Sequence, residues 1–148
     1  MNNRYYYLSA AAVIRGDSIA PRLNGNVWFY DTPEGVRVDA QIYCLPPNET
    51  GFYGFHIHTE GNCAGTDFSA AQGHYNPENT EHPMHAGDFP MLLATDTKNA
   101  WLSFITTRFT VRDIIGRSVI IHEGRDDYAT QPAGDSGRRI GCGIIYSI

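Results

Sequence analysis

Two long irregular segments constrain the fold of this chain more than any other feature. Residues 59–95 and 124–139 show no sustained strand or helix period, and the first of them is rich in Gly, Asn, Asp, Pro and His. Connections of this length are uncommon in a compact domain unless they are functional or held in place. Metal coordination can hold them, because it offsets the entropy of closing a long loop.

Short segments with strand character flank the two irregular ones. They are predicted from alternation and from β-branched and aromatic content, and they cover residues 4–15, 22–30, 36–45, 51–58, 99–109, 117–123 and 140–148. A tight turn at 32–35 and a turn-like piece at 111–116 connect some of them. We expect one domain over residues 1–148 that is all-β, an eight-stranded Greek-key β-sandwich or flattened barrel with two long functional loops.

Composition excludes several classes of protein. A chain of 148 residues is long enough to bury a real core. Its net charge of -5 argues against general nucleic-acid binding. No stretch approaches the roughly 20 apolar residues that a membrane span requires. The first residues lack a charged segment followed by an apolar run and a cleavage site, so we expect no signal peptide in the chain as given.

The three cysteines set a limit on cross-linking. They are Cys44, Cys63 and Cys142, and none of them forms a CxxC pair. A four-cysteine zinc site is therefore excluded. An odd count allows at most one internal disulfide and leaves at least one thiol over.

All six histidines lie in or next to the irregular segments. His56 and His58 are two residues apart in a predicted strand, so they share one face while the apolar residues between and before them share the other. His122 alternates with apolar residues in the same way, just before the second irregular segment. These three side chains could project from the outside of one sheet. An exposed strand face is the alternative for the pair, and a surface histidine is the alternative for His122.

The joint pattern of ligand-type residues favours two metal sites. Within 15 residues, the first irregular segment offers three imidazoles and, among its carboxylates, one that would complete a suitable tetrahedral zinc set. These residues are His74, His82, His85 and Asp88. The strand histidines with one more imidazole would suit copper, which favours nitrogen ligands. A zinc-only structural domain, and a copper carrier without turnover, stay open as alternatives because fold alone does not fix function.

The sequence resembles the copper-zinc superoxide dismutases, and bacterial members in particular. The resemblance is carried, in the family's order, by GFHIHTEGNC, GHYNP, HAGDFP, VIIHEG and GRRIGCGII. The N-terminal third matches only as strands of the right number. The resemblance implies an oxidoreductase that disproportionates superoxide to dioxygen and hydrogen peroxide by redox cycling of a histidine-bound copper beside a zinc. Superoxide would be the substrate, nucleic acid and membrane spans are not expected, and a homodimer is possible.

The resemblance also implies a role for each site residue. Copper would be bound by His56, His58, His74 and His122. Zinc would be bound by His74, His82, His85 and Asp88. His74 would bridge the metals and serve in catalysis as the proton source, and Arg139 would attract the anionic substrate. Asp126 would link a copper histidine to a zinc histidine. Cys63 and Cys142 would form the disulfide that ties the first irregular segment to the last strand.

Several residues depart from the family pattern or have no role in it. Gln72 stands before GHYNP, where a small residue is common, and only two residues separate His82 from His85, so the chain must turn tightly there. Cys44 is expected to be a small hydrophobe buried within its strand. Arg138 is expected to be a solvated charge. The compartment is left open, because a disulfide suggests an oxidising space while the chain as given shows no export signal and reads as cytoplasmic.

Overall fold

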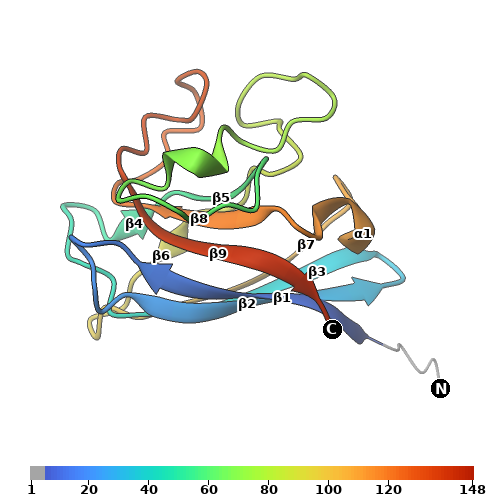
Figure 1. Ribbon diagram of the computed structural model, residues 1–148, viewed down its shortest axis with the longest axis horizontal. Helices are drawn as coiled ribbons and strands as arrows, with labels where there is room; N and C mark the ends of the chain where they lie inside the picture. The colour runs from blue at the N-terminus through green and yellow to red at the C-terminus, as the bar shows by residue number, and fades with distance from the viewer. Residues whose placement is uncertain (1–5) are drawn as a thin grey trace.

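The computed structural model describes residues 6–148 and consists almost entirely of antiparallel strands (Figure 1). The strands are β1 (Tyr7–Gly16), β2 (Asn24–Thr32), β3 (Gly35–Tyr43), β4 (Phe52–Tyr53), β5 (Phe55–His58), β6 (Leu92–Leu93), β7 (Ala100–Thr106), β8 (Ser118–His122) and β9 (Arg139–Ser147). A 3-10 turn, η1 (Ser69–Ala71), and a one-turn helix, α1 (Val111–Ile114), complete the elements of the described part. The prediction of an all-β fold is confirmed. The first two residues of the predicted first strand lie outside the described range.

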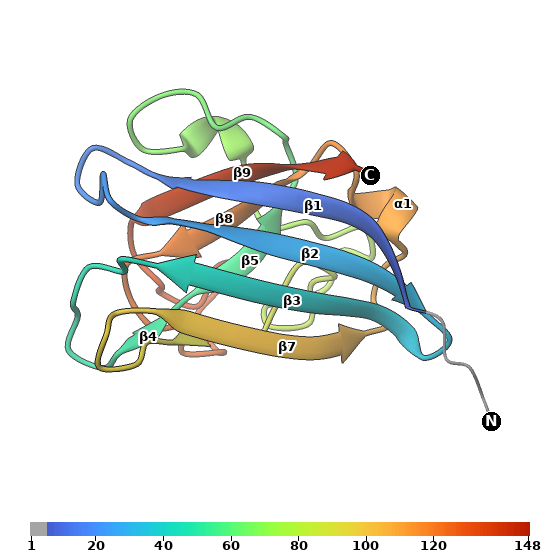
Figure 2. The same cartoon turned by 90° about the horizontal axis from the view of Figure 1, so that it is seen from below.

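A seven-stranded sheet in the order β5-β8-β9-β1-β2-β3-β7 curls into two layers. Strands β1, β2, β3 and β7 form one layer, and β9, β8 and β5 form the other (Figures 1 and 2). A second sheet pairs β4 with β6. Because β4 directly precedes β5, and β6 lies against β7, this small pair closes much of the gap between the two ends of the sheet. The chain changes layer between β3 and β4, returns between β5 and β7, and changes again between β7 and β8, as in a Greek key.

Strict alternation explains how the core forms between the layers. Strands β2 and β3 bury every second residue over most of their length, and their register sets Val27 opposite Ala40 and Phe29 opposite Val38. All four of these side chains are fully buried. Removing such apolar surface from water stabilises the fold by about 25 cal/mol per Å².

Strands β5 and β8 differ from this pattern because every one of their residues is buried. One face of the two strands packs into the core. The other face lies under two long connections, the first loop (residues 59–91) and the second loop (residues 123–138), which lie over β5 and β8 in Figure 1. The alternative of an exposed strand face for His56 and His58 is therefore wrong, since their residues are 0% and 1% exposed.

A disulfide between Cys63 and Cys142 fastens the first loop to β9, with the two Cα atoms 5.8 Å apart. Cys142 is buried with Phe68, Ala71 and Ile120 in a small cluster outside the main core. This pairing agrees with the disulfide that the resemblance implied. The loop segment around η1 is thereby held over the outer face of β8 and β9.

The structure corrects three sequence-based expectations about local structure. The predicted strand 51–58 is interrupted at Gly54 and divides into β4 and β5, and the irregular segment 59–95 contains η1 and the short strand β6. Cys44 is not buried within a strand: β3 ends one residue earlier, and Cys44 is partly exposed. Its φ of 59° lies in the left-handed region, which ends the extended chain there.

None of the helices in the described range is long and apolar enough to cross a membrane.

Candidate metal centre

Both edges of β5 help to bring the ligand-type residues together. On one edge, antiparallel pairing with β8 sets His56 opposite Ile120 and His58 opposite Ser118. On the other edge, the first loop makes two isolated bridges to the same strand, His56 with Asp88 and His58 with His74. Residues on β5 and on the loop thus become neighbours although the loop has no regular structure.

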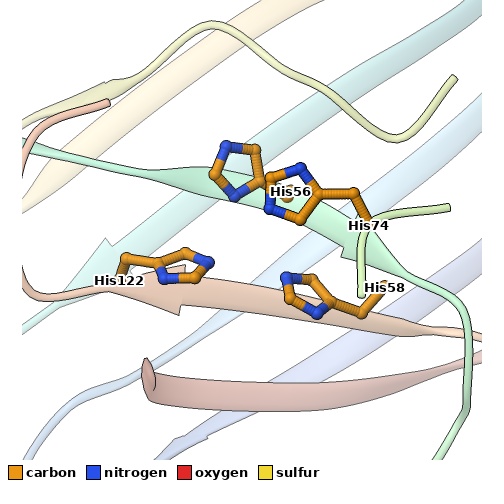
Figure 3. Close-up of side chains that lie close together, drawn as sticks. All are labelled: His56, His58, His74 and His122. Carbon is orange, nitrogen blue, oxygen red and sulfur yellow. The ribbon is translucent and has the colours of Figure 1, made fainter. Parts of the chain in front are cut away.

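The first ligand group consists of His56, His58, His74 and His122, and all four are buried (Figure 3). One nitrogen from each ring lies within 4.8 Å of the corresponding nitrogen of every other ring. His122 joins the group from β8, where its backbone N–H donates to the Gly54 carbonyl at 2.8 Å. Four histidine side chains from two strands and one loop therefore surround one small space.

Within the described residues, four ring nitrogens of this group are buried without a hydrogen-bond partner: His56 Nδ1, His58 Nε2, His74 Nε2 and His122 Nε2. Unpartnered buried polar atoms are costly. The opposite ring nitrogens are satisfied, because His58 Nδ1 lies 2.7 Å from the Gln72 carbonyl oxygen and His122 Nδ1 lies 3.1 Å from that of Gly137. A carbonyl oxygen can only accept a hydrogen bond, so Nδ1 of each ring carries the proton and Nε2 carries the free lone pair. This arrangement fits a nitrogen-bound metal such as copper.

The second ligand group shares His74 with the first and adds His82, His85 and Asp88. The Asp88 carboxylate lies at its centre, 2.7 Å from His74 Nδ1, 3.0 Å from His82 Nδ1 and 3.2 Å from His85 Nδ1. Three imidazole nitrogens and one carboxylate are a tetrahedral zinc set. The His74 ring belongs to both groups, since its Nδ1 faces this one and its Nε2 faces the other.

Asp126 joins the two groups from the second loop. Its two carboxylate oxygens lie 2.7 Å from His56 Nε2 and 2.7 Å from His82 Nε2, and the residue is 2% exposed. Each imidazole donates its N–H to this carboxylate, which leaves Nδ1 of both rings free to ligate. Outer partners of this kind fix the ring orientation and tautomer of metal ligands.

Burial lowers the pKa of three imidazoles of the first group, those of His56, His58 and His122, and so favours their neutral form. Desolvation is the largest cause that lowers the pKa of His56 and of His58 well below the usual value, and neighbouring histidines lower both further. Burial likewise lowers the pKa of His122 to about 4, against a hydrogen bond to Gly137 that opposes the shift. Neutral imidazole is the form that binds metals.

In the second group, the pKa shifts of His85 and Asp88 favour a neutral imidazole beside an ionised carboxylate. Burial lowers the pKa of His85. Burial alone would raise the pKa of Asp88, but the hydrogen bond from His74 and the surrounding imidazoles hold it below the ordinary value. Both shifts favour the protonation states that a zinc site requires.

Arg139 stands at the edge of the first group. It lines a cavity of about 270 Å³ together with three of the group's histidines, His58, His74 and His122. Its Nη1 donates to the Phe68 carbonyl at 2.8 Å, so the first loop holds the side chain in place. The guanidinium is the cationic group of that lining and stays charged in proteins.

The expectation that Arg138 is a solvated charge is wrong. Its guanidinium forms an ion pair with Asp17 at 2.7 Å, and the Asp17 side chain is only 1% exposed. The same side chain donates to the Thr66 carbonyl at 3.3 Å. Arg138 therefore ties the second loop to the β1–β2 turn, a contact that links residues far apart in sequence and has no local signal.

Gly134 is a site residue that the sequence analysis missed. It has a φ of 71°, and a Cβ at this position would lie 2.0 Å from Asp126 Oδ1 and 2.6 Å from His82 Nε2. Only glycine leaves room there for the bridge between Asp126 and His82. Gln72, noted in the sequence as unusual, also has a positive φ of 62°, a conformation that favours glycine.

The curled β-sheet and the two adjoining ligand groups define a β-sheet protein with a histidine-rich metal centre. The chain matches the family described as copper/zinc superoxide dismutase (SODC) over residues 23–145. It therefore belongs to the copper/zinc superoxide dismutase family.

Individual relatives agree with this assignment. The chain is 34% identical over 135 residues to Superoxide dismutase [Cu-Zn] 2 of Aquifex aeolicus, covering 82% of this chain and 78% of that protein. It is 35% identical over 147 residues to Superoxide dismutase [Cu-Zn] of Deinococcus radiodurans, covering 86% and 79%. The crystal structure of a double mutant of a SOD-like protein from Bacillus subtilis matches with a TM-score of 0.79 and 31% identity, covering 92% of this chain and 96% of that one.

Proposed function

We propose that this chain disproportionates superoxide, using copper held by the first ligand group and zinc held by the second. Two superoxide anions and two protons then give dioxygen and hydrogen peroxide. The observation that carries the proposal is the set of four buried, unpartnered ring nitrogens that face one space. Family membership supports copper and zinc as the metals.

Each metal has a separate contribution when bound. Copper supplies a one-electron redox couple, whereas zinc has no redox chemistry and serves as a structural and electrostatic centre. The residues that would hold copper are His56, His58, His74 and His122. Those that would hold zinc are His74, His82, His85 and Asp88.

The chain's own residues bring the substrate and protons to the site. Arg139 provides the positive charge in the cavity lining, which attracts a small anion and raises its local concentration. The His74 ring has Nδ1 on the second group and an unpartnered Nε2 on the first, so Nε2 would ligate copper and would be the atom that holds a proton whenever it does not coordinate the metal. Asp126 orients His56 and His82 and thereby keeps the two groups aligned.

The direct test measures metal content and superoxide consumption on the same sample of protein loaded with copper and zinc. We expect one copper and one zinc per chain and rapid superoxide loss. His122→Ala should abolish turnover and weaken copper binding but leave zinc bound, because His122 belongs only to the first group. Saturation at one metal would contradict the two-metal proposal. Full loading without superoxide consumption would favour the copper carrier instead.

Assembly and compartment belong to the same proposal. The resemblance allows a homodimer without requiring one, and sedimentation equilibrium of the metal-loaded protein would measure the mass of the assembly. The disulfide between Cys63 and Cys142 supports an extracytoplasmic form of the protein, because disulfides persist in oxidising compartments. Fractionation of the source cells, followed by detection of the protein, would test that placement.

A further inference from the structure

The turn from His82 to His85 carries two histidines of the second ligand group. Only two residues separate them, so the turn must direct both rings into the same site. Met84 N donates to the Glu81 carbonyl at 2.7 Å, and Asp88 N donates to the His85 carbonyl at 3.1 Å. The turn lies at the surface, with Met84 59% exposed, although both histidines are buried. No regular element contains it, so its shape must be fixed by contacts from outside.

Gln131 holds one end of this turn from the second loop. Its Oε1 accepts from His82 N at 2.8 Å, and its Nε2 donates to the His82 carbonyl at 2.7 Å. One side-chain amide thus satisfies both backbone groups of a single residue, as a neighbouring strand would. The His82 ring is held separately by Asp126. His82 is therefore fixed at its backbone and at its side chain by two residues of the same loop.

Arg108 holds the other end from the segment after β7. Its Nη1 donates to the Pro83 carbonyl at 2.9 Å and to the His85 carbonyl at 3.1 Å. Its Nη2 contacts Met84 Sδ at 3.8 Å. The planar guanidinium fork suits such convergent acceptors, whereas a lysine ammonium is a point charge on a flexible stem. Arg108 therefore contacts every residue from Pro83 to His85.

We propose that Gln131 and Arg108 are positioning residues that preorganise the zinc-binding turn, although neither offers an atom to the metal. This inference rests on the proposed zinc role of the second ligand group. Because these contacts order the turn before zinc binds, the free energy of zinc binding is not reduced by the entropic cost of ordering it. Without these contacts the entropic cost of ordering the turn would be subtracted from the free energy of zinc binding. Zinc affinity would drop, while the first ligand group kept its geometry.

The experiment compares zinc affinity among variants by competition with a chromophoric chelator, and it follows Co²⁺ in the zinc group by visible absorption. Gln131→Met and Arg108→Ala should each weaken zinc binding by about 10-fold, the lower end of what loss of an outer partner costs. Gln131→Glu keeps the acceptor for His82 N but replaces the donor by an anionic oxygen facing the His82 carbonyl, so we expect zinc binding to weaken in this variant as well. Arg108→Lys should recover part of the affinity.

Matched controls separate positioning from general stability. Gln41→Met changes a residue of β3, where Gln41 Oε1 accepts from the Tyr43 hydroxyl, and Arg112→Ala changes an exposed residue of α1. These variants should leave zinc affinity and the Co²⁺ spectrum unchanged. Copper affinity should stay native in all variants, which shows that each one folds.

Two results would overturn the inference alone. The first is native zinc affinity and a native Co²⁺ spectrum in Gln131→Met and Arg108→Ala, which leaves the proposed function intact. The second is an equal loss of zinc and copper affinity, which indicates general destabilisation. A native chain that binds no zinc would instead overturn the proposed function, and this inference with it.

Discussion

At the scale of single residues, the hydrogen-bond partner of one ring nitrogen decides which nitrogen of each histidine can ligate. Backbone carbonyls on Nδ1 of His58 and His122 leave Nε2 free, whereas the Asp126 carboxylate on Nε2 of His56 leaves Nδ1 free. The first ligand group therefore mixes the two ring nitrogens. The identity of the residue is the same in each case, and only its hydrogen-bond partner differs.

Arg139→Ala should slow superoxide consumption without changing metal content, because it removes the positive charge from the cavity lining. Electrostatic steering raises encounter rates by about 10 to 1,000-fold, and one arginine should account for the lower part of that range. Raising ionic strength should slow the native protein more than the variant. The variant has already lost the Arg139 charge, so salt has less of the attractive field left to screen in it. Stopped-flow rates at several salt concentrations would measure both effects.

Arg125→Ala is the appropriate control for that variant. Arg125 is an exposed residue of the second loop and does not line the cavity. Arg138→Ala would be unsuitable, because it would leave the buried Asp17 carboxylate without its ion-pair partner. If Arg139→Ala and Arg125→Ala lose rate and salt dependence equally, the steering role assigned to Arg139 is wrong.

At the scale of elements, the first loop is the piece that connects the disulfide to the metal centre. Between Cys63 and His74 it supplies two carbonyls, that of Phe68 to Arg139 and that of Gln72 to His58. The disulfide at the start of this stretch therefore anchors residues that shape the cavity. The first loop is thus joined to β9 by the disulfide and by the hydrogen bond from Arg139 to the Phe68 carbonyl.

Replacing both cysteines, Cys63→Ala with Cys142→Ala, should lower the free energy of unfolding by roughly 4 kcal/mol, because the bond closes a loop of 79 residues in the unfolded chain. Superoxide consumption should also fall, since the carbonyls that hold Arg139 and His58 become less restrained. Denaturant unfolding and rate measurements would test this. Mass spectrometry of the unreduced native protein should show Cys44 free, and a peptide linking Cys44 to either of the others would refute the pairing.

At the scale of the whole molecule, burying neutral histidines makes stability depend on pH. The folded pKa of His122 is about 4, below the unfolded value of about 6.5. The folded state therefore binds fewer protons, so the stabilising contribution is complete above pH 6.5 and is lost as pH falls toward 4. His56 and His58 shift in the same direction, and burial is the main cause for each.

Metal-free protein should consequently lose stability on acidification, by about 2 kcal/mol between pH 6.5 and pH 5 from His122 alone. Urea unfolding of chelator-treated protein at pH 8, 6.5 and 5 would measure the trend. Metal-loaded protein serves as the comparison and should be more stable at each pH, because bound metal stabilises the folded state. Equal stability of the metal-free protein at all three values would show that these histidines do not remain neutral in the fold.

The alternation of apolar and polar residues along the chain, together with residue type, is sufficient to predict part of the fold and of the site from the amino-acid sequence. Alternation in β5 and β8 sets His56, His58 and His122 on the face opposite the core, because successive side chains of a strand point to opposite faces. The clustering of ligand-type residues in the first loop is likewise evident in the order of the amino acids. The two-residue pairing of β4 with β6 has no such signal, because two residues are too few to show a period.

The way the irregular segments meet the sheet depends instead on tertiary contacts. The bridges that set Asp88 beside His56, the reach of Asp126 to two rings, and the burial of Asp17 under Arg138 all join residues distant in sequence. Gln131 and Arg108 hold the His82 turn in the same way. Loops have no side-chain periodicity that fixes their direction, so their positions follow from hydrogen bonds, ion pairs and the disulfide, which join residues that only the folded sheet brings together.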